Sequence, residues 1–528
     1  MSWRKTTGRS DVIACDGVVA SSQPLATQAG LNIIRKGGNA IDAAITTAAV
    51  LDVVEPFSTG CGGDAFTLIH LAGNSKPLSY NGSGRSGSLV TIQELLDKGW
   101  TSIPARGGPP VTVPGALDLW FHVVEKHGNL EMKDILSSAI HYARNGFPVS
   151  PLIGQTWKEV IGVLRNDAAR QIFAPKGEAP IVGQVVRNKD LADTYETVAK
   201  EGPDAFYSGR IAESIVNEVQ DHGGFLTMED LASHKTEETQ PISVSYRGVD
   251  VYEHPPNSQG FAALSMLSIM ETFDFSSLAP LSTERYHLMI EAKKLAYADL
   301  HQHNADPEFY DVPLEKLLSK SYAKERAETI DPNLAMSVYA PGLSLGQDTV
   351  YFATADGEGN AVSFINSLYM GIGSGLVAPG TGIKLQNRGH LFSLDPDHPN
   401  CYAPKKLPFH TIIPAALYKE NELSGVFGIM GGAHQAQAHG QFVSSLVDYG
   451  MSPQEALDQP RFNHDHSTNK VGLESGIPSK TQKELRERGH ILIHETASYF
   501  GGGQAILRLE DAWIAGSDYR KDGQAAGF

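Results

Sequence analysis

The sequence predicts an α+β fold in which stacked sheets lie between helical layers, and three observations support this prediction. Helical patterns dominate residues 24–54 and 115–240, and strand patterns dominate from residue 349 onward. A further helix is expected at 433–449, after the last of these strands. The chain also has 53 glycines among 528 residues, above the usual ~7%, which indicates many tight turns and close backbone approaches.

The N-terminal elements have clear local signals. Residues 11–22 (DVIACDGVVASS) predict a short strand, and Pro24 then marks the first turn of a helix that ends at a Gly-Gly pair. Asn39 is expected to cap a second helix, AIDAAITTAAVLDVV, whose alanines suit close packing on a sheet. The Gly-rich turn STGCGG then leads into a strand that runs through His70.

The middle of the chain continues the alternation of strands and helices. Residues 76–90 predict a strand and a loop, and 105–116 predict a Pro/Gly loop before a helix. A strand pair is expected at 242–254, and 257–305 read as helical. A weakly patterned linker follows at 331–348. The strands after this linker are expected at 349–355, 361–367, 411–418 and 424–430.

Composition and charge exclude several function classes. The formal net charge is −17 with no long run of either sign, whereas a nucleic-acid binder normally has a basic face. Three widely spaced cysteines, at 15, 61 and 401, form neither a disulfide framework nor a CxxC metal site. The first 17 residues have no apolar secretory core, and no stretch of about 18 apolar residues occurs. A cytoplasmic protein without a membrane span or a nucleic-acid partner is expected.

The stretch LGQDTVYFATADGEGNAVSF, residues 345–364, predicts a β-hairpin entered from a polar, Gly-rich loop. Its first strand begins abruptly at Asp348-Thr349. A Thr hydroxyl is a poor nucleophile without a base. A cut before Thr349 would free an α-amine with a reference pKa near 7.7–8.0, which can act as that base. Thr also opens many strands for structural reasons alone, so the residues leave both interpretations open.

Two Gly-rich loops are further candidates for function. In GIMGGAHQ a strand ends at Gly431-Gly432 and a helix begins, and consecutive N–H groups at such a turn can bind an anion or an oxyanion. In NGSGRSG, Arg85 can bind a carboxylate through two hydrogen bonds. The alternatives are a turn that only needs small residues and an Arg that faces solvent. The Arg85 loop lacks the endings of a Walker or a dinucleotide motif.

Histidines occur as HQH at 301–303, as HDH at 464–466, and at His434 and His439 of the expected helix. None has the HExxH spacing of a zinc site. Surface histidines are therefore expected, and no metal is.

Several of these segments occur together in one protein family. Residues 17–66 (GVVASSQPLATQAGLNIIRKGGNAIDAAITTAAVLDVVEPFSTGCGGDAF) resemble the N-terminal signature of the γ-glutamyltranspeptidases. The resemblance continues through TVPGALDLW, MSPQEALDQPRF and GSDYRKDGQAAG, and it covers nearly the whole chain in order. The chain is thereby identified as a member of this family.

The resemblance implies the fold and the processing of an N-terminal nucleophile hydrolase. The fold of such proteins has four layers: helix, sheet, sheet, helix. Their precursor cuts itself before a Thr at a strand start, and the motif GNAV at 359–362 places that residue at Thr349. The bond between Asp348 and Thr349 is then the cleavage site. A large fragment, 1–348, and a small fragment, 349–528, are expected to stay associated as one structural unit, a heterodimer; whether two heterodimers pair is left open.

The resemblance also implies a two-step acyl transfer. Thr349 Oγ1 attacks an amide carbonyl with its own α-amine as base, and the N–H groups of Gly431 and Gly432 form the oxyanion hole. Ser367 matches a family Thr that hydrogen-bonds to the nucleophile. Water or another amine then takes the acyl group from the acyl-threonine. The mechanism requires no cofactor.

The chain departs from the family at the acyl pocket. Gly82 replaces the Arg that holds the glutamyl α-carboxylate, with Arg85 as a substitute three residues on. Leu391 stands where an Asp holds the α-amine, and a nearby Gln is replaced by Arg388. His410 and Thr411 replace the family's paired serines, and Tyr369 replaces an Asn that contacts the substrate. The expected substrate-binding residues are therefore Arg85, Tyr369, Arg388, Leu391, His410 and Thr411.

These departures indicate a changed acyl group. A pocket that has gained Arg388 and lost an acidic partner suits an acyl chain with a carboxylate and no ammonium, such as glutaryl. In this respect the chain is similar to the cephalosporin or glutaryl acylases. The segment 395–408 is also short, so the lid loop of many members is expected to be absent.

The expected function is a self-processing amidase or acyltransferase that acts on γ-glutamyl-like or glutaryl-like small-molecule amides. Two alternatives stay open. One is a genuine γ-glutamyltransferase or glutathione hydrolase with an altered pocket. The other is an unprocessed, non-catalytic homologue that serves as a binding protein.

Overall fold

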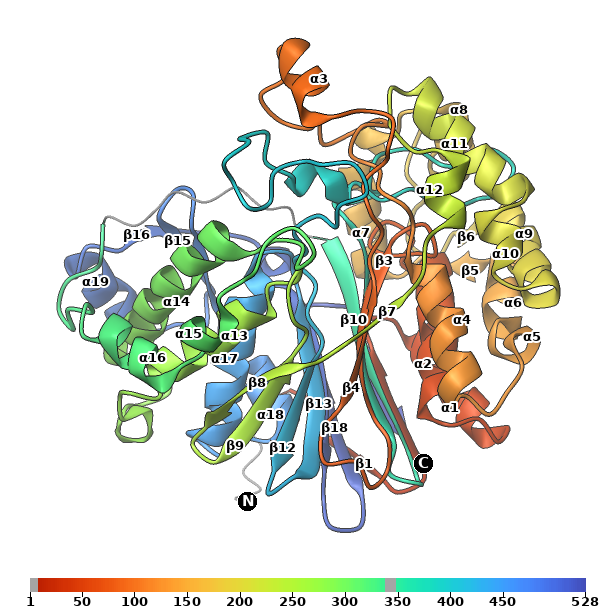
Figure 1. Ribbon diagram of the computed structural model, residues 1–528. Coiled ribbons are helices and arrows are strands. Elements are labelled where there is room, and N and C mark those ends of the chain that lie inside the picture. Colours follow the sequence, from red (N-terminus) through yellow and green to blue (C-terminus); the bar gives the residue numbers. More distant parts are fainter. Residues whose placement is uncertain (1–7, 338–347) are drawn as a thin grey trace.

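The computed structural model describes residues 8–337 and 348–528 and has two antiparallel seven-stranded sheets packed face to face (Figure 1). Helices cover the outer face of each sheet, so the layers run helix, sheet, sheet, helix. This confirms the predicted four-layer α+β sandwich. Within the described ranges, the structure has no helix that is both long and apolar enough to cross a membrane.

Each sheet contains strands from both sides of Thr349, so the two expected fragments share both sheets. The first sheet has the strand order β1 (Val12–Ala14), β18 (Trp513–Ser517), β17 (Gly502–Arg508), β13 (Glu422–Met430), β12 (Ala415–Lys419), β9 (Val249–Glu253) and β8 (Ile242–Tyr246). The second sheet has the order β19 (Gln524–Gly527), β2 (Gly17–Ser21), β10 (Asp348–Asp356), β11 (Ala361–Tyr369), β3 (Asp64–His70), β4 (Leu78–Gly82) and β7 (Glu237–Thr239).

The two sheets meet across an apolar core that includes Phe66 and Ile365 from the second sheet and Val426 and Ile506 from the first. The sheets approach closely at Gly428, where a Cβ atom would lie 2.4 Å from ring carbons of Tyr351. This packing requires glycine in the middle of β13, because any larger residue would push the sheets apart.

One helical layer covers the second sheet, at the right of Figure 1. Its helices are α1 (Pro24–Arg35), α2 (Ala40–Val54), α4 (Ala116–His127), α5 (Met132–Ile135), α6 (Ser137–Asn145), α7 (Pro151–Val160), α8 (Asp167–Phe173), α9 (Lys189–Glu201), α10 (Asp204–Tyr207), α11 (Arg210–Asp221) and α12 (Met228–Ala232). Helix α3 (Ile92–Asp97) projects from the body of the molecule, and β5 (Phe147–Pro148) pairs with β6 (Val185–Val186).

The other helical layer covers the first sheet. Its helices are α13 (Gly260–Met270), α14 (Thr283–His303), α15 (Leu314–Leu317), α16 (Lys320–Ala327), α17 (His434–Val447), α18 (Pro453–Asp458) and α19 (Ser479–Glu487). A small sheet of β14 (Phe462–Asp465), β15 (Lys470–Leu473) and β16 (Ile491–Ile493) lies beside them. Four short 3₁₀ turns complete the described structure: η1 (Ile161–Val163), η2 (Phe275–Ser277), η3 (Arg388–Leu391) and η4 (Ala497–Phe500).

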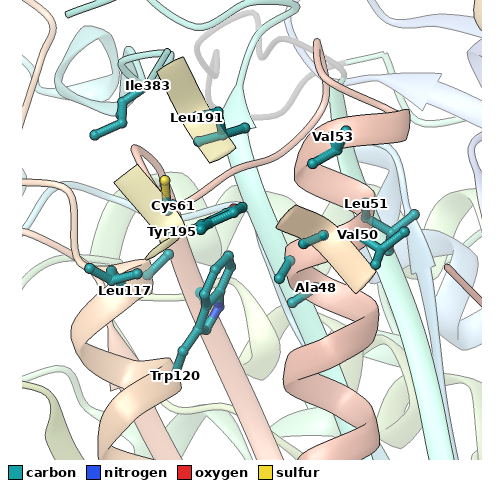
Figure 2. Close-up of a cluster of buried hydrophobic side chains, with 14 of the residues drawn as sticks. Ala48, Val50, Leu51, Val53, Cys61, Leu117, Trp120, Leu191, Tyr195 and Ile383 are labelled. Atoms are coloured by element: carbon teal, nitrogen blue, oxygen red, sulfur yellow. The ribbon is translucent and has the colours of Figure 1, made fainter. Parts of the chain in front are cut away.

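Helix α2 is buried along its whole length, as its alanine content predicts. Asn39 and Asp42 form a reciprocal capping box that satisfies the first N–H groups of the helix. Figure 2 shows alanine, valine and leucine side chains of α2 beside Trp120 of α4 and Tyr195 of α9. Small side chains on α2 let these large aromatic residues fill the space between the helices.

A buried ion pair joins α2 to the loop after β11. Lys384 Nζ contacts Asp52 Oδ1, and the two side chains are 1% and 0% exposed. Asp52 Oδ2 also accepts hydrogen bonds from Cys61 N and Tyr195 Oη. Because all of these partners are buried, the carboxylate depends on them for its solvation.

The expected elements before residue 450 are present, with one clear error. The strand expected at 411–418 begins only at Ala415, because Pro414 cannot donate a ladder hydrogen bond and Ile413 N donates to Gln435 instead. The sequence analysis predicted no helix or strand after residue 450. Residues 338–347 of the expected linker lie outside the described residues, as do residues 1–7.

The expectation of surface histidines is wrong for His434, His439, His464 and His466, which are all at most 5% exposed. Helix α17 lies between the first sheet and the helices α13 and α14, so its polar side chains are buried along with its apolar ones. His439 Nδ1, for example, lies 2.7 Å from Glu253 Oε1, and its Nε2 accepts from Ile429 N. These two contacts of His439 replace hydrogen bonds that its ring would make with water.

We expect Lys384→Met to lower the free energy of unfolding by about 3–5 kcal/mol, because it leaves the Asp52 carboxylate buried without its cation. Denaturant unfolding followed by circular dichroism measures the change. The double variant Asp52→Asn/Lys384→Met removes both charges and should recover most of the loss. A single variant as stable as the wild type would contradict this prediction.

Candidate active site

Thr349 lies at an irregularity in the β10–β11 hairpin. Asp348 pairs with Tyr369 and Val350 pairs with Asn366, so Thr349 faces two residues, Ser367 and Leu368. This is a β-bulge in β11, a feature that is over-represented next to active sites because it redirects side chains. Because the extra residue lies in β11, the bulge changes the direction of the side chains of Ser367 and Leu368 beside Thr349.

The hydroxyl of Ser367 is a junction of hydrogen bonds. Thr349 Oγ1 lies 3.0 Å from Ser367 Oγ. Ser367 Oγ also accepts from Arg388 Nη2 at 3.0 Å and from Tyr369 N at 2.8 Å. Either hydroxyl can donate in the contact between Thr349 Oγ1 and Ser367 Oγ. Such a bond orients the Thr349 hydroxyl.

Arg388 extends this network toward the acyl pocket expected from the sequence. Its Nη1 donates to Thr411 Oγ1 at 2.8 Å, and its guanidinium carbon lies 4.6 Å from the centre of the Tyr369 ring. The side chain is fully buried, and burial lowers the pKa of the Arg388 guanidinium to about 10. It is therefore still charged at neutral pH. The structure thus brings together five of the expected site residues: Thr349, Ser367, Tyr369, Arg388 and Thr411.

His410 faces the buried carboxyl group of Asp64, with 2.9 Å between His410 Nε2 and Asp64 Oδ2. Gln386 Nε2 donates to Asp64 Oδ1 at 3.0 Å, and Gln386 Oε1 accepts from Arg388 N at 3.2 Å. Burial raises the pKa of Asp64 to about 7, against the lowering effect of the Arg388 charge. Burial also lowers the pKa of His410 well below its usual range, so the ring is neutral.

The turn at Gly431-Gly432 joins β13 to α17 in a conformation that favours glycine. The two residues have φ angles of +140° and +57°. Gln259 Nε2 donates to Gly432 O at 2.9 Å and also to Thr411 O. One buried amide therefore ties the expected oxyanion-hole turn to the segment that carries Thr411 and His410.

The comparison with known proteins gives the family. A family model described as Gamma-glutamyltranspeptidase matches residues 26–528. The chain belongs to the γ-glutamyltranspeptidase family.

Individual relatives agree with this assignment. The chain is 40% identical to the glutathione hydrolase-like YwrD proenzyme of Bacillus subtilis (strain 168), over 98% of this chain and 99% of that protein. It is 34% identical to the glutathione hydrolase proenzyme of Escherichia coli (strain K12), over 98% and 93% of the two chains. The crystal structure of the cephalosporin acylase from Bacillus halodurans matches with a TM-score of 0.94 at 43% identity, over 100% of this chain and 98% of that one.

Family membership makes the chain an enzyme of the N-terminal nucleophile type, a hydrolase or transferase that acts on amides through an acyl-enzyme. This confirms the predicted recognition, fold and enzyme class. The roles of the individual residues stay predictions.

Two expected binding residues of this family member lie in other surroundings. The Arg85 guanidinium contacts Glu237 at 2.7 Å and both Asp306 and Glu308 at 3.1 Å. With three carboxylates around it, Arg85 is already neutralised, so Arg388 is the stronger candidate for a substrate carboxylate. Leu391 is 1% exposed in an apolar cluster with Tyr369, where it offers no partner to an ammonium group.

The sequence analysis missed Asp64, Gln259 and Gln386. Asp64 directly follows the Gly-rich turn STGCGG, and a carboxylate at the start of an otherwise apolar strand is a signal that could have indicated it. Gln259 and Gln386 carry no signal in the sequence, since a lone glutamine is usually a surface residue. Their importance comes from contacts with distant segments.

Among the described residues, His287, Glu291 and His490 are placed closely enough to hold a metal ion. Their contacts favour a different role. His287 Nδ1 lies 2.8 Å from His490 Nε2, and Lys294 pairs with Glu291 at 2.8 Å, so a cation is already present. Glu291 Oε2 accepts from Met336 N, which anchors the residues that precede the expected cleavage segment.

We expect Gln259→Glu to lower kcat by about 10- to 100-fold with a smaller change in KM, because a carboxylate in place of the amide would repel Gly432 O and Thr411 O and displace the oxyanion turn. Steady-state kinetics on the processed enzyme measures this. Gln441→Glu is the matched control, since Gln441 is a buried glutamine of α17 whose amide contacts Gln437 O and Phe462 O. Equal losses in both variants would show a general effect on stability.

Proposed function

We propose that the chain is a self-processing amidase that cleaves its own Asp348–Thr349 bond and then hydrolyses, or transfers, acyl groups that carry a terminal carboxylate. The observation that carries this proposal is the contact chain from Arg388 Nη2 to Ser367 Oγ to Thr349 Oγ1. The buried Arg388 cation therefore lies two hydrogen bonds from Thr349 Oγ1. A short dicarboxylic acyl chain such as glutaryl spans a similar distance.

The processing step uses the same hydroxyl as the catalytic cycle. Thr349 Oγ1 attacks the carbonyl carbon of Asp348, the peptide C–N bond breaks, and an ester joins the two residues. Water then hydrolyses the ester and leaves a carboxylate on residue 348 and an α-amine on Thr349. The names of the relatives from B. subtilis and E. coli, both proenzymes, support this step. The products, 1–348 and 349–528, would remain one heterodimer because they share both sheets.

In the catalytic cycle, the α-amine of Thr349 accepts the hydroxyl proton while Oγ1 attacks the substrate amide. The N–H groups of Gly431 and Gly432 stabilise the tetrahedral oxyanion, and the proton passes to the departing amine. Water, activated by the same α-amine, then releases the acid from the acyl-threonine. Arg388 and Thr411 hold the distal carboxylate, Tyr369 stacks on the guanidinium, and Leu391 closes the place where an ammonium partner would stand.

Glutathione hydrolysis is the second candidate function, and the names of the two bacterial relatives favour it. The two candidates differ in the group next to the acyl carboxylate. A γ-glutamyl group carries an α-ammonium, whereas a glutaryl group carries hydrogen there. We further propose that the enzyme acts in the cytoplasm on small-molecule amides.

We expect Thr349→Ala to abolish both processing and activity, because it removes the hydroxyl that performs both steps. A denaturing gel with N-terminal sequencing of the smaller band measures processing, and the wild-type band should begin TVYFA. Thr349→Ser is the control, since it keeps a hydroxyl and should still split, at a lower rate. A Thr349→Ala chain that splits at this bond would overturn the mechanism.

We expect wild-type kcat/KM to be at least about tenfold higher for glutaryl-p-nitroanilide than for γ-glutamyl-p-nitroanilide, since no acidic group replaces the missing Asp at Leu391. Arg388→Lys keeps the charge but loses the planar pair of donors, so it should reduce the rate on the glutaryl substrate much more than on butyryl-p-nitroanilide. A preference for the γ-glutamyl substrate would favour glutathione hydrolysis instead.

A further inference from the structure

Asp64 is a buried carboxyl group that the mechanism above does not use. It is the first residue of β3, and its side chain is 0% exposed. Its Oδ1 accepts from Gly84 N and from Gln386 Nε2, both at 3.0 Å, whereas its Oδ2 lies 2.9 Å from His410 Nε2. The two oxygens therefore have different roles. Oδ1 must be an acceptor, while Oδ2 can either accept a hydrogen bond from His410 Nε2–H or, when protonated, donate one to Nε2.

The protonation state of Asp64 decides which nitrogen of His410 carries the proton. When Asp64 is ionised, His410 Nε2–H donates to Oδ2, and Nδ1 is an acceptor. When Asp64 is neutral, its Oδ2–H donates to Nε2, and the ring proton is on Nδ1. The ring is neutral in both states, because burial and the Arg388 charge disfavour the imidazolium.

Arg388 is the charged group that acts most strongly on Asp64, and Gln386 joins the two residues. His410 and the Tyr207 hydroxyl of α10 also act on Asp64, the backbone N–H groups of Gly84 and Gly115 donate to it, and His254 acts on His410. Within the described part of the chain, Arg388 Nε and His410 Nδ1 are buried and have no hydrogen-bond partner. Buried polar atoms are rarely left in this state, so a ligand group is a natural partner for them.

We propose that Asp64 is a positioning residue that sets the charge and the donor pattern of the acyl pocket, so that a carboxylate-bearing acyl group binds best when Asp64 is neutral. The inference rests on the proposed preference for such acyl groups. With Asp64 neutral, the Arg388 charge is uncompensated and His410 Nδ1–H is an additional donor. With Asp64 ionised, the Arg388 charge is offset and Nδ1 becomes an acceptor, which disfavours a second carboxylate.

The direction of the pH dependence follows from these states. Burial raises the pKa of Asp64 to about 7, so both states occur near neutral pH. A bound carboxylate beside Arg388 stabilises the neutral form of Asp64 and raises its pKa further. The affinity for the acyl carboxylate is therefore full below pH 7 and falls as the pH rises above it.

The variant Asp64→Asn reproduces the neutral state. The Asn Oδ1 can accept from Gly84 N and Gln386 Nε2, and the Asn Nδ2 can donate to His410 Nε2, as the neutral carboxyl does. The experiment measures the ratio of kcat/KM for glutaryl-p-nitroanilide to that for butyryl-p-nitroanilide between pH 6 and 8.5. The ratio isolates the carboxylate, because the Thr349 amine acts on both substrates and in both enzymes.

We expect the wild-type ratio to fall about tenfold between pH 6 and 8.5, and the Asp64→Asn ratio to change by less than about twofold. Asp230→Asn is the matched control: Asp230 is another buried aspartate, which caps α12, and it should keep the wild-type profile. Equal slopes for the wild type and Asp64→Asn would overturn the proposal. If Asp64→Asn does not fold, calorimetry of glutarate binding to the wild type at pH 7.5 in two buffers decides, and binding without proton uptake overturns the proposal.

The same data separate the two levels of inference. A glutaryl preference that does not depend on Asp64 leaves the proposed function in place and removes only the role of Asp64. A ratio near one at every pH, together with no detectable glutarate binding, removes the carboxylate preference itself and the role of Asp64 with it.

Discussion

The hydrogen bond between Thr349 Oγ1 and Ser367 Oγ is the contact on which the site depends. It forms across the bulge of the β10–β11 hairpin, so the geometry of the proposed nucleophile depends on strand pairing in a seven-stranded sheet. At this level β11 is held on both edges, because Ser367 also pairs with Asp64 of β3, and a strand held in this way gives Ser367 a fixed position beside the Thr349 hydroxyl. Arg388 and the other proposed substrate-binding groups connect to Thr349 through Ser367.

The proposed acyl pocket consists of buried polar groups that depend on one another. Arg388 contacts Ser367 and Thr411, and Gln386 links it to Asp64. A buried guanidinium is tolerated only when its charge and its N–H groups find partners, and here Ser367 and Thr411 each accept one hydrogen bond from it. The groups that the pocket can bind in addition therefore depend on the whole cluster. A change at one member, such as the protonation of Asp64, alters what the others can bind.

The buried histidines show that the core of this two-sheet fold also contains polar residues. Histidine spacing alone suggested a solvated face, yet α17 is covered on both sides, and the side chains of Gln435 and Gln437 near its N-terminal end bond to neighbouring segments. Gln435 Oε1 accepts from Ile413 N, and Gln437 Nε2 donates to Asn463 and His464 O. Burial of these groups is acceptable because the hydrogen bonds replace water.

Local chemistry in the sequence was sufficient for the β-hairpin at Thr349, the helix cap at Asn39 and the strand-to-helix turn at Gly431-Gly432. Each of these features depends on residues within a few positions of one another. The family motifs added the expected nucleophile. Only the tertiary structure decided that Arg85 is neutralised by three carboxylates and that His410 faces Asp64, 346 positions away. Contacts between such distant residues arise from sheet pairing and layer packing, which no local pattern of side chains encodes.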